Sequence, residues 1–187
     1  MPIDKNADNI QVMVRVRPLN NREKEEDSKA CVKIDESSSG CIILDCKPEQ
    51  KRFFFDWVGG ENTTQQAIFK TVGEPMVAAC LEGFNCCIFA YGQTGAGKTF
   101  TMQGKGLDDN SDVHSRGLQP RVFDYIFKKV KEEMQSNENV NYLISCTYLE
   151  IYNEQIRDLV NISSLSLVLT VKTFSSNHLN RCRSERI

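Results

Sequence analysis

The chain has 187 residues, of which 40% are hydrophobic and 26% are charged, and its formal net charge is −2. This composition is typical of a globular protein, and it excludes collagen, a disordered polyelectrolyte and a multi-span membrane protein. The small net charge indicates neither a nucleic-acid nor a membrane partner, and we expect neither. No apolar run is long enough to cross a bilayer and no secretory signal is recognisable, so we expect a cytosolic protein.

The predicted elements begin with short strands joined by polar segments. Apolar and polar residues alternate over residues 10–17 and the pattern stops at Pro18, which predicts a strand. Residues 20–29 are dense in charge and favour a solvated loop or a short helix. Residues 41–44 and 52–55 are strand-like again, and these short strands could form a small meander.

A helix is predicted to begin at Thr63. Thr63 and Gln66 fit a capping box, in which each side chain satisfies the backbone N–H of the other residue. Pro75 predicts a kink or a break near Glu74, because proline cannot donate a helical hydrogen bond. Gly83 is the predicted end of the helix.

The following segments alternate between strand and helix. Residues 86–91 form a continuous apolar run, which is typical of a strand buried on both faces. Residues 104–117 are polar and predict a surface loop, after which Pro120 opens an amphipathic helix. Residues 141–152 predict a further strand, apolar enough to be central. This order of elements predicts an α/β fold with a sheet covered on both faces.

Eight cysteines are spread along the chain without a C-x-x-C pair. They are Cys31, Cys41, Cys46, Cys80, Cys86, Cys87, Cys146 and Cys182. Several lie among apolar neighbours, so we expect free, buried thiols that pack as small hydrophobic groups. A disulfide framework would need an oxidising compartment, which nothing else in the sequence indicates.

The apolar run leads into a complete match to the phosphate-loop pattern G-x-x-x-x-G-K-[ST]. The matching residues are Gly92, Gln93, Thr94, Gly95, Ala96, Gly97, Lys98 and Thr99. Glycines let backbone N–H groups converge on phosphate oxygens, and the following helix directs its N-terminal partial charge at the anion. Lys98 can reach the β- and γ-phosphates, and the Thr99 hydroxyl can ligate Mg²⁺. A chance match rarely lies between a buried strand and a helix, so we predict a nucleotide site.

Four segments in order then carry a more specific pattern than the phosphate loop alone. They are VRVRPL at residues 14–19, IFAYGQTGAGKTFTM at 88–102, RGLQPR at 116–121 and YLEIYNEQIRDL at 148–159. Together they resemble the motor domain of the kinesins. The resemblance implies a P-loop NTPase-type α/β fold, with a mostly parallel central sheet and helices on both faces, of which this chain holds an incomplete part.

The resemblance also divides the chain and implies its ligands. Residues 1–9 form an N-terminal extension and residues 10–160 resemble the N-terminal part of the motor domain. Residues 161–187 form a divergent, basic, Ser/Asn-rich tail, in which residues 165–171 could form a strand by alternation. ATP and Mg²⁺ are the implied cofactors, microtubules the implied partner, and the cytoplasmic cytoskeleton the implied location.

Four residues outside the phosphate loop are implied to line the nucleotide. Arg15, Arg17 and Pro18 are expected to border the adenine, with Tyr91 nearby, because a guanidinium group can stack on a purine face. The alternative for both arginines is an ordinary solvent-facing strand position. The alternative for Tyr91 is a simple aromatic residue of the core.

The segments that kinesins use for hydrolysis are absent from these residues. Kinesins carry an N-x-x-S-S-R-S-H loop and a D-L-A-G-S-E loop, and neither pattern occurs in the sequence. Residues 161–166 and 175–178 are superficially similar to the first loop but lack its arginine, and we treat both as coincidence. We therefore identify no catalytic residue, leave open whether the chain is an enzyme, and expect no substantial microtubule-stimulated ATPase activity from these residues.

Two interpretations remain open from the sequence. The first is the ATP-binding, N-terminal portion of a kinesin-type microtubule motor. The second is a truncated, non-motor nucleotide-binding fragment without ATPase activity or motility. An unrelated small-molecule kinase is disfavoured, because such enzymes usually place the phosphate loop near the N-terminus, whereas here it begins at Gly92.

Overall fold

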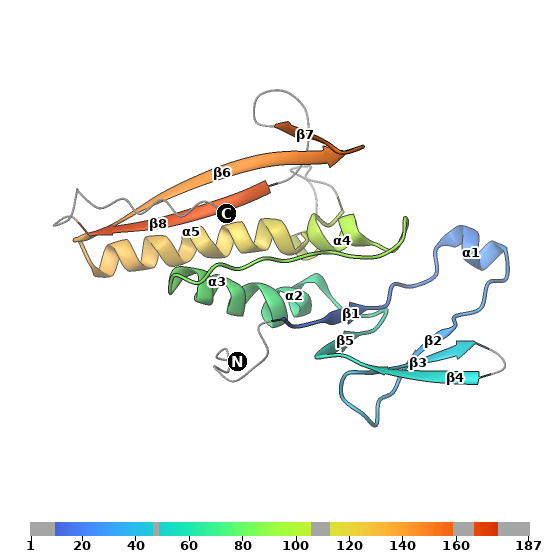
Figure 1. The fold of residues 1–187 in the computed structure, drawn as a ribbon. Coiled ribbons are helices and arrows are strands. Elements are labelled where there is room, and N and C mark those ends of the chain that lie inside the picture. Colours follow the sequence, from blue (N-terminus) through green and yellow to red (C-terminus); the bar gives the residue numbers. More distant parts are fainter. Residues whose placement is uncertain (1–9, 47–48, 106–112, 159–166, 176–187) are drawn as a thin grey trace. The chain divides into compact units, whose positions relative to one another are not determined.

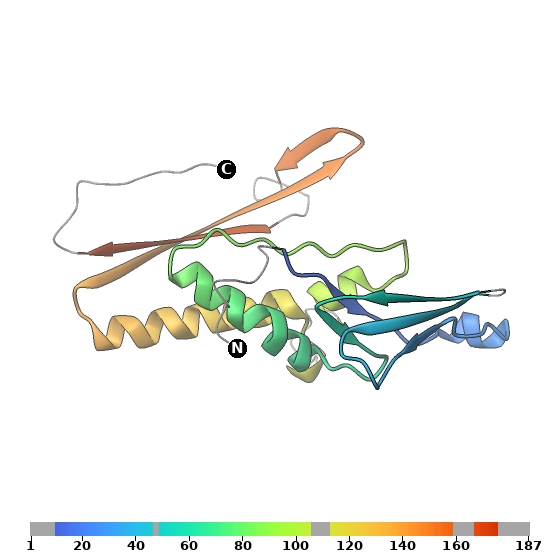
Figure 2. The same cartoon turned by 60° about the horizontal axis from the view of Figure 1, so that its bottom comes forward.

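A computed structural model describes four stretches of the chain: residues 10–46, 49–105, 113–158 and 167–175. The chain divides into two compact units. Unit 1 holds residues 1–76 and 86–122, and unit 2 holds residues 77–85 and 123–187. Figures 1 and 2 show the elements of both units.

Parallel strand pairing in unit 1 joins β1 (Met13–Arg15) to β5 (Trp57–Gly59). Met13 lies opposite Trp57, and the pairing continues beyond β1, where the Val16 N–H donates to the Gly59 carbonyl at 2.8 Å. The strand predicted over residues 10–17 is therefore present in a shorter form. A parallel pair needs a long crossover connection, which the segment between the two strands supplies.

That connection contains a short helix and an antiparallel meander. The helix α1 (Asn21–Glu25) has Asn20 as its N-cap, and the Asn20 side chain forms a capping box with Glu23. Of the loop and the short helix predicted as alternatives for residues 20–29, the structure thus contains the helix. The meander has the order β2 (Val32–Ile34), β3 (Cys41–Cys46) and β4 (Glu49–Phe54) (Figure 1). The predicted meander is confirmed, and β2 is an additional strand.

A continuous helical stretch follows β5, and its start differs from the prediction. It comprises α2 (Gln65–Ile68), the π-helical turn η1 (Phe69–Gly73) and α3 (Glu74–Leu81). The predicted capping box of Thr63 is wrong, because Thr64 is the N-cap and its hydroxyl accepts from the Ala67 N–H at 3.1 Å. The π-helical turn ends at Gly73, one residue short of the position before Pro75, and Pro75 cannot donate the regular helical hydrogen bond.

The helical stretch ends as predicted at Gly83. Its φ of 97° is in the left-handed region, and the Phe84 N–H returns to the Ala79 carbonyl at 3.0 Å. This 6→1 bond is the mark of a glycine-capped helix end.

The strand predicted for residues 86–91 is wrong. None of the described strands pairs with this segment, and five of its six residues are exposed, with Phe89 88% exposed. Apolar composition alone does not make a strand, because a strand exists through hydrogen bonds to neighbouring strands. The segment therefore has no regular secondary structure.

Two helices and a short turn follow the phosphate loop. The helix α4 (Lys98–Met102) has five residues, η2 (Val113–Ser115) is a 3₁₀ turn, and α5 (Leu118–Ser136) has 19 residues. Pro120 lies in the first turn of α5, where its missing N–H costs nothing. Ile126 and Val130 are buried on the predicted apolar face of α5.

Unit 2 contains a three-stranded antiparallel sheet with β6 (Val140–Tyr152) at its centre, between β7 (Gln155–Asp158) and β8 (Leu167–Ser175) (Figure 2). The predicted central strand is thus confirmed. A two-residue turn joins β6 to β7, with φ of 49° at Asn153 and 63° at Glu154. Positive φ at both positions is typical of a tight hairpin turn.

The expectation of buried thiols is largely wrong. The six cysteines whose side chains the structure describes are free, as predicted, but Cys41 alone among them is fully buried. Cys86 and Cys87 are exposed because they lie in the unpaired segment before the phosphate loop. Cys46 and Cys182 lie outside the described side chains. Within the described residues, no helix is both long and apolar enough to cross a membrane.

Candidate nucleotide-binding site

The phosphate loop runs from Gly92 into α4 and has the backbone that its sequence requires. Gly95 has a φ of 81°, and Gly97, the N-cap of α4, has a φ of 94°. A Cβ atom built on either glycine would meet no atom within 4 Å. The positive φ excludes most other residues, and the open space leaves the backbone accessible to a ligand.

Backbone N–H groups around this turn are available to an anion. The Ala96 N–H closes the turn by donating to the Gln93 carbonyl at 3.1 Å. Among the described residues, the N–H groups of Gly95, Gly97 and Lys98 have no acceptor within the protein. Because α4 is only five residues long, these amides rather than a helix dipole supply most of the attraction for phosphate.

Lys98 places a positive charge on the same loop. Its ammonium group donates to the Gly92 carbonyl at 2.8 Å and to the Gln93 carbonyl at 2.9 Å. These carbonyls hold the half-buried side chain across the loop, where a phosphate oxygen would compete for its protons. Thr99 is exposed beside it, and its hydroxyl is a hard oxygen ligand of the type that Mg²⁺ prefers. These residues therefore fit a magnesium nucleotide.

Arg15 lies at the end of β1 and is bonded to three groups of unit 1. Its Nη1 donates to Thr101 Oγ1 at 3.0 Å and to Gln65 Oε1 at 3.1 Å, and its Nη2 donates to the Thr63 carbonyl at 3.1 Å. The guanidinium group also lies over the Phe100 ring, 5.0 Å from its centroid. Burial lowers the pKa of Arg15, but an arginine stays protonated at neutral pH.

Arg17 lies two residues further on and has different partners. It forms a two-pronged ion pair with Glu23, at 2.6 and 2.7 Å, and also donates to the Pro18 carbonyl at 2.9 Å. The hydrogen bond from Arg17, with a second one from the Asn20 N–H, lowers the pKa of Glu23 from its ordinary 4.5 to about 2. Arg17 is thus fixed beside Pro18 but remains partly exposed.

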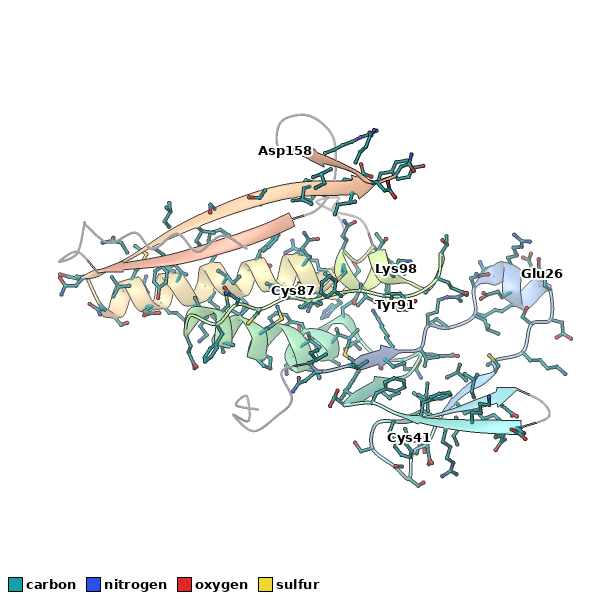
Figure 3. The ribbon with its side chains drawn as sticks, viewed as in Figure 1. Glu26, Cys41, Cys87, Tyr91, Lys98 and Asp158 are labelled. Carbon is teal, nitrogen blue, oxygen red and sulfur yellow. The ribbon has the colours of Figure 1, made fainter. Side chains whose placement is uncertain are left out.

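Tyr91 is fully exposed directly before the loop, so it is not a core aromatic residue (Figure 3). Its ring is accessible to a ligand, and the predicted role of Tyr91 near the base stays a prediction. No cluster of three or more metal-ligating side chains occurs within the described part of the chain.

Sequence reasoning assigned no role to two residues that organise this region. Gln65 is a buried polar residue, and its amide bonds both Arg15 and the backbone of α4. Arg121 bonds the side chain of Gln66 and the carbonyls of Val113 and Arg116, which closes the loop before α5. The bonds of Gln65 to Arg15 and Phe100, and the bond of Arg121 to Gln66, join residues far apart in the sequence, so no local pattern could indicate them.

Comparison with protein families decides the assignment. The family model of the kinesin motor domain matches residues 15–183. The chain belongs to the kinesin motor domain family.

Curated kinesins are similar over most of the chain. It is 44% identical over 165 residues to the kinesin-like protein KIN-12D of Arabidopsis thaliana and 42% identical over 164 residues to the kinesin-like protein KIF15 of Homo sapiens. These alignments cover 86% and 87% of this chain but 6% and 12% of the two relatives. This kinesin chain therefore spans a small part of their length.

A solved kinesin structure confirms the fold class. The chain is similar to a structure described as that of a fast kinesin, with a TM-score of 0.72 and 34% sequence identity, over 89% of this chain and 49% of that one. The likeness, together with the parallel pair and the helices, supports a partial α/β fold of the P-loop NTPase type. The family match extends beyond residue 160, and the boundary predicted there stays a prediction.

Proposed function

We propose that this chain carries the ATP-binding portion of a kinesin-type microtubule motor. The observation that carries the proposal is the phosphate loop, in which Gly95 and Gly97 leave unpaired amides open beside Lys98. A chain that belongs to the kinesin motor family and keeps this geometry is equipped to bind a nucleoside triphosphate.

The roles within the loop follow from its donors. Backbone N–H groups of residues 92–99 would surround the phosphate oxygens, and Lys98 would bond the β- and γ-phosphates as a point charge. Thr99 would hold Mg²⁺, which neutralises the negative charge between the two phosphates. Lys98 would exchange the carbonyls of Gly92 and Gln93 for phosphate oxygens, which are stronger acceptors.

The base would lie beside the end of β1. Arg17 donates to the Pro18 carbonyl and is fixed by its ion pair with Glu23, and Tyr91 has an exposed ring that a purine could contact. We propose these three residues for the adenine, whereas the bonds that Arg15 makes within unit 1 favour a different role.

Hydrolysis, microtubule binding and movement belong to the proposed complete motor. The chain covers 49% of the fast kinesin structure and no more than 12% of the two curated relatives, so these activities are proposed for the whole protein. A cytoplasmic location on the cytoskeleton is proposed with them.

Titration with a fluorescent ATP analogue in the presence of Mg²⁺ tests the proposal. Lys98→Ala should weaken binding about tenfold or more, since it removes a charge-assisted hydrogen bond to phosphate. Lys70→Ala, which removes the same charge from an exposed position on η1, is the matched control and should bind as the wild type does. Equal affinity of the wild type and Lys98→Ala would contradict the proposal.

A further inference from the structure

A cluster of polar groups behind the phosphate loop ties the helix α4 to β1 and α2. Arg15 reaches from β1 to the Thr101 hydroxyl on α4 at 3.0 Å and to the Gln65 side-chain oxygen on α2 at 3.1 Å. Gln65 in turn donates from Nε2 to the Phe100 carbonyl at 2.7 Å. Arg15 therefore holds α4 through the side chain of Thr101, and Gln65 holds it through the backbone carbonyl of Phe100.

The cluster is buried enough to make these bonds matter. Gln65 is 4% exposed, and both ends of its amide are hydrogen-bonded. Removing that amide would leave the Phe100 carbonyl without this donor and Arg15 Nη1 with Thr101 as its remaining acceptor, and polar groups that lose a partner are costly when they are kept from water. The guanidinium group of Arg15 also lies over the Phe100 ring, and this is a third contact that holds α4.

The helix depends on such outside contacts because it is short. Five residues form few internal hydrogen bonds, so α4 has little stability of its own. Lys98 and Thr99 are its first two residues, and Phe100 and Thr101 directly follow them. Whatever holds the second pair also sets the direction of the first pair.

We propose that Gln65 and Arg15 are positioning residues for nucleotide binding, which hold α4 so that Lys98 and Thr99 face the phosphates and Mg²⁺. The inference rests on the proposed function of the phosphate loop. Arg15 acts here through α4 and not by contact with the base.

The experiment separates positioning from mere stability. In the 187-residue chain, Gln65→Leu keeps the side-chain size but removes both hydrogen bonds, and Gln66→Leu is the matched control on the same helix, where the amide bonds Arg121 instead. Both variants should lower the melting temperature. Well below both melting temperatures, Gln65→Leu should bind the magnesium complex of a fluorescent ATP analogue about tenfold more weakly, and Gln66→Leu should stay within about twofold of the wild type.

A second variant covers the case in which Gln65→Leu does not fold. Thr101→Val is isosteric and removes the hydroxyl that Arg15 bonds on α4, so it should weaken binding about threefold. Wild-type affinity in Thr101→Val, or in a folded Gln65→Leu, would overturn the inference while leaving the proposed function intact. A wild-type chain that does not bind the analogue, or binds it equally after Lys98→Ala, would overturn the proposed function and this inference with it.

Discussion

The two ends of helix α4 use glycine in opposite ways. Before the helix, a Cβ at Gly95 would meet nothing within 4 Å. After the helix, a Cβ at Gly104 would overlap the carbonyl oxygen of Ser115 and lie 2.6 Å from the Gly117 nitrogen. Both glycines have positive φ, 81° and 94°, so the difference lies in their surroundings and not in their backbone. The first glycine leaves room for a ligand, and the second lets two segments of the fold touch.

Backbone hydrogen bonds show what the contact at Gly104 achieves. Gly104 and Arg116 form an isolated antiparallel bridge, and the Gly117 N–H donates to the Gln103 carbonyl at 2.9 Å. These bonds fix the end of α4 against the segment that leads into α5. The end of α4 near Gly95 is thus open to a ligand, and the end near Gly104 is packed closely against the rest of unit 1.

The largest expected effect is at the packed end. Gly104→Ala should destabilise the chain by about 3 kcal/mol, because it adds left-handed backbone strain to an overlap with backbone atoms that cannot move away. Chemical denaturation would measure the loss. Gly83→Ala is the matched control, since Gly83 also has positive φ but open surroundings, and it should cost about 1 kcal/mol. Equal losses of unfolding free energy in Gly104→Ala and Gly83→Ala would contradict the claim that close packing distinguishes the end of α4 at Gly104.

The open end should show the reverse result. Gly95→Ala should cost about 1 kcal/mol of stability, as Gly83→Ala does, because both substitutions add only backbone strain. It should also weaken binding of an ATP analogue about tenfold, since the new methyl group occupies space that the phosphates need. Parallel titrations of both variants check this. An affinity in Gly95→Ala equal to that of Gly83→Ala would show that the open space is not a ligand site.

The smallest expected effect concerns the ion pair between Arg17 and Glu23, which lies outside the hydrogen-bonded group of Arg15 and Gln65. Because the folded pKa of Glu23 is about 2 and its ordinary value is 4.5, the pair with Arg17 stabilises the chain above about pH 4.5, and this contribution is lost as the pH falls towards 2. Melting temperatures between about pH 5 and pH 3 should therefore fall less steeply in Glu23→Gln than in the wild type. Glu25→Gln, on the same helix, should keep the wild-type slope, and the idea fails if all three slopes coincide.

The long helix and the long strand that follows it could be predicted from the sequence. The amphipathic pattern after Pro120 predicts the helix α5, and the strand-forming, apolar residues 141–152 predict β6, which the structure places at the centre of a sheet. The apolar run at residues 86–91 carries an equally clear pattern but does not pair with any described strand. A helix is decided by its own residues, whereas a strand depends on which partners it finds.

The candidate site likewise has one part that could be predicted from the sequence and one part that could not. The phosphate loop could be recognised because its eight residues are consecutive, and the structure gives its glycines the expected backbone. The support behind it could not be recognised, because Arg15 bonds residues that are 50 and 86 positions away along the chain. Resemblance to kinesins drew attention to Arg15 as a contact for adenine, which stays a prediction, whereas the structure shows that Arg15 links β1 to α4.

Amide hydrogen exchange, with and without saturating MgATP, tests the central claim most directly. If the backbone of residues 92–99 surrounds the phosphates, exchange of these amides should slow markedly on addition of MgATP. The meander formed by β2, β3 and β4 should exchange as before, and Lys98→Ala should abolish the change in the loop. Exchange at residues 92–99 that is the same with and without MgATP would contradict the account.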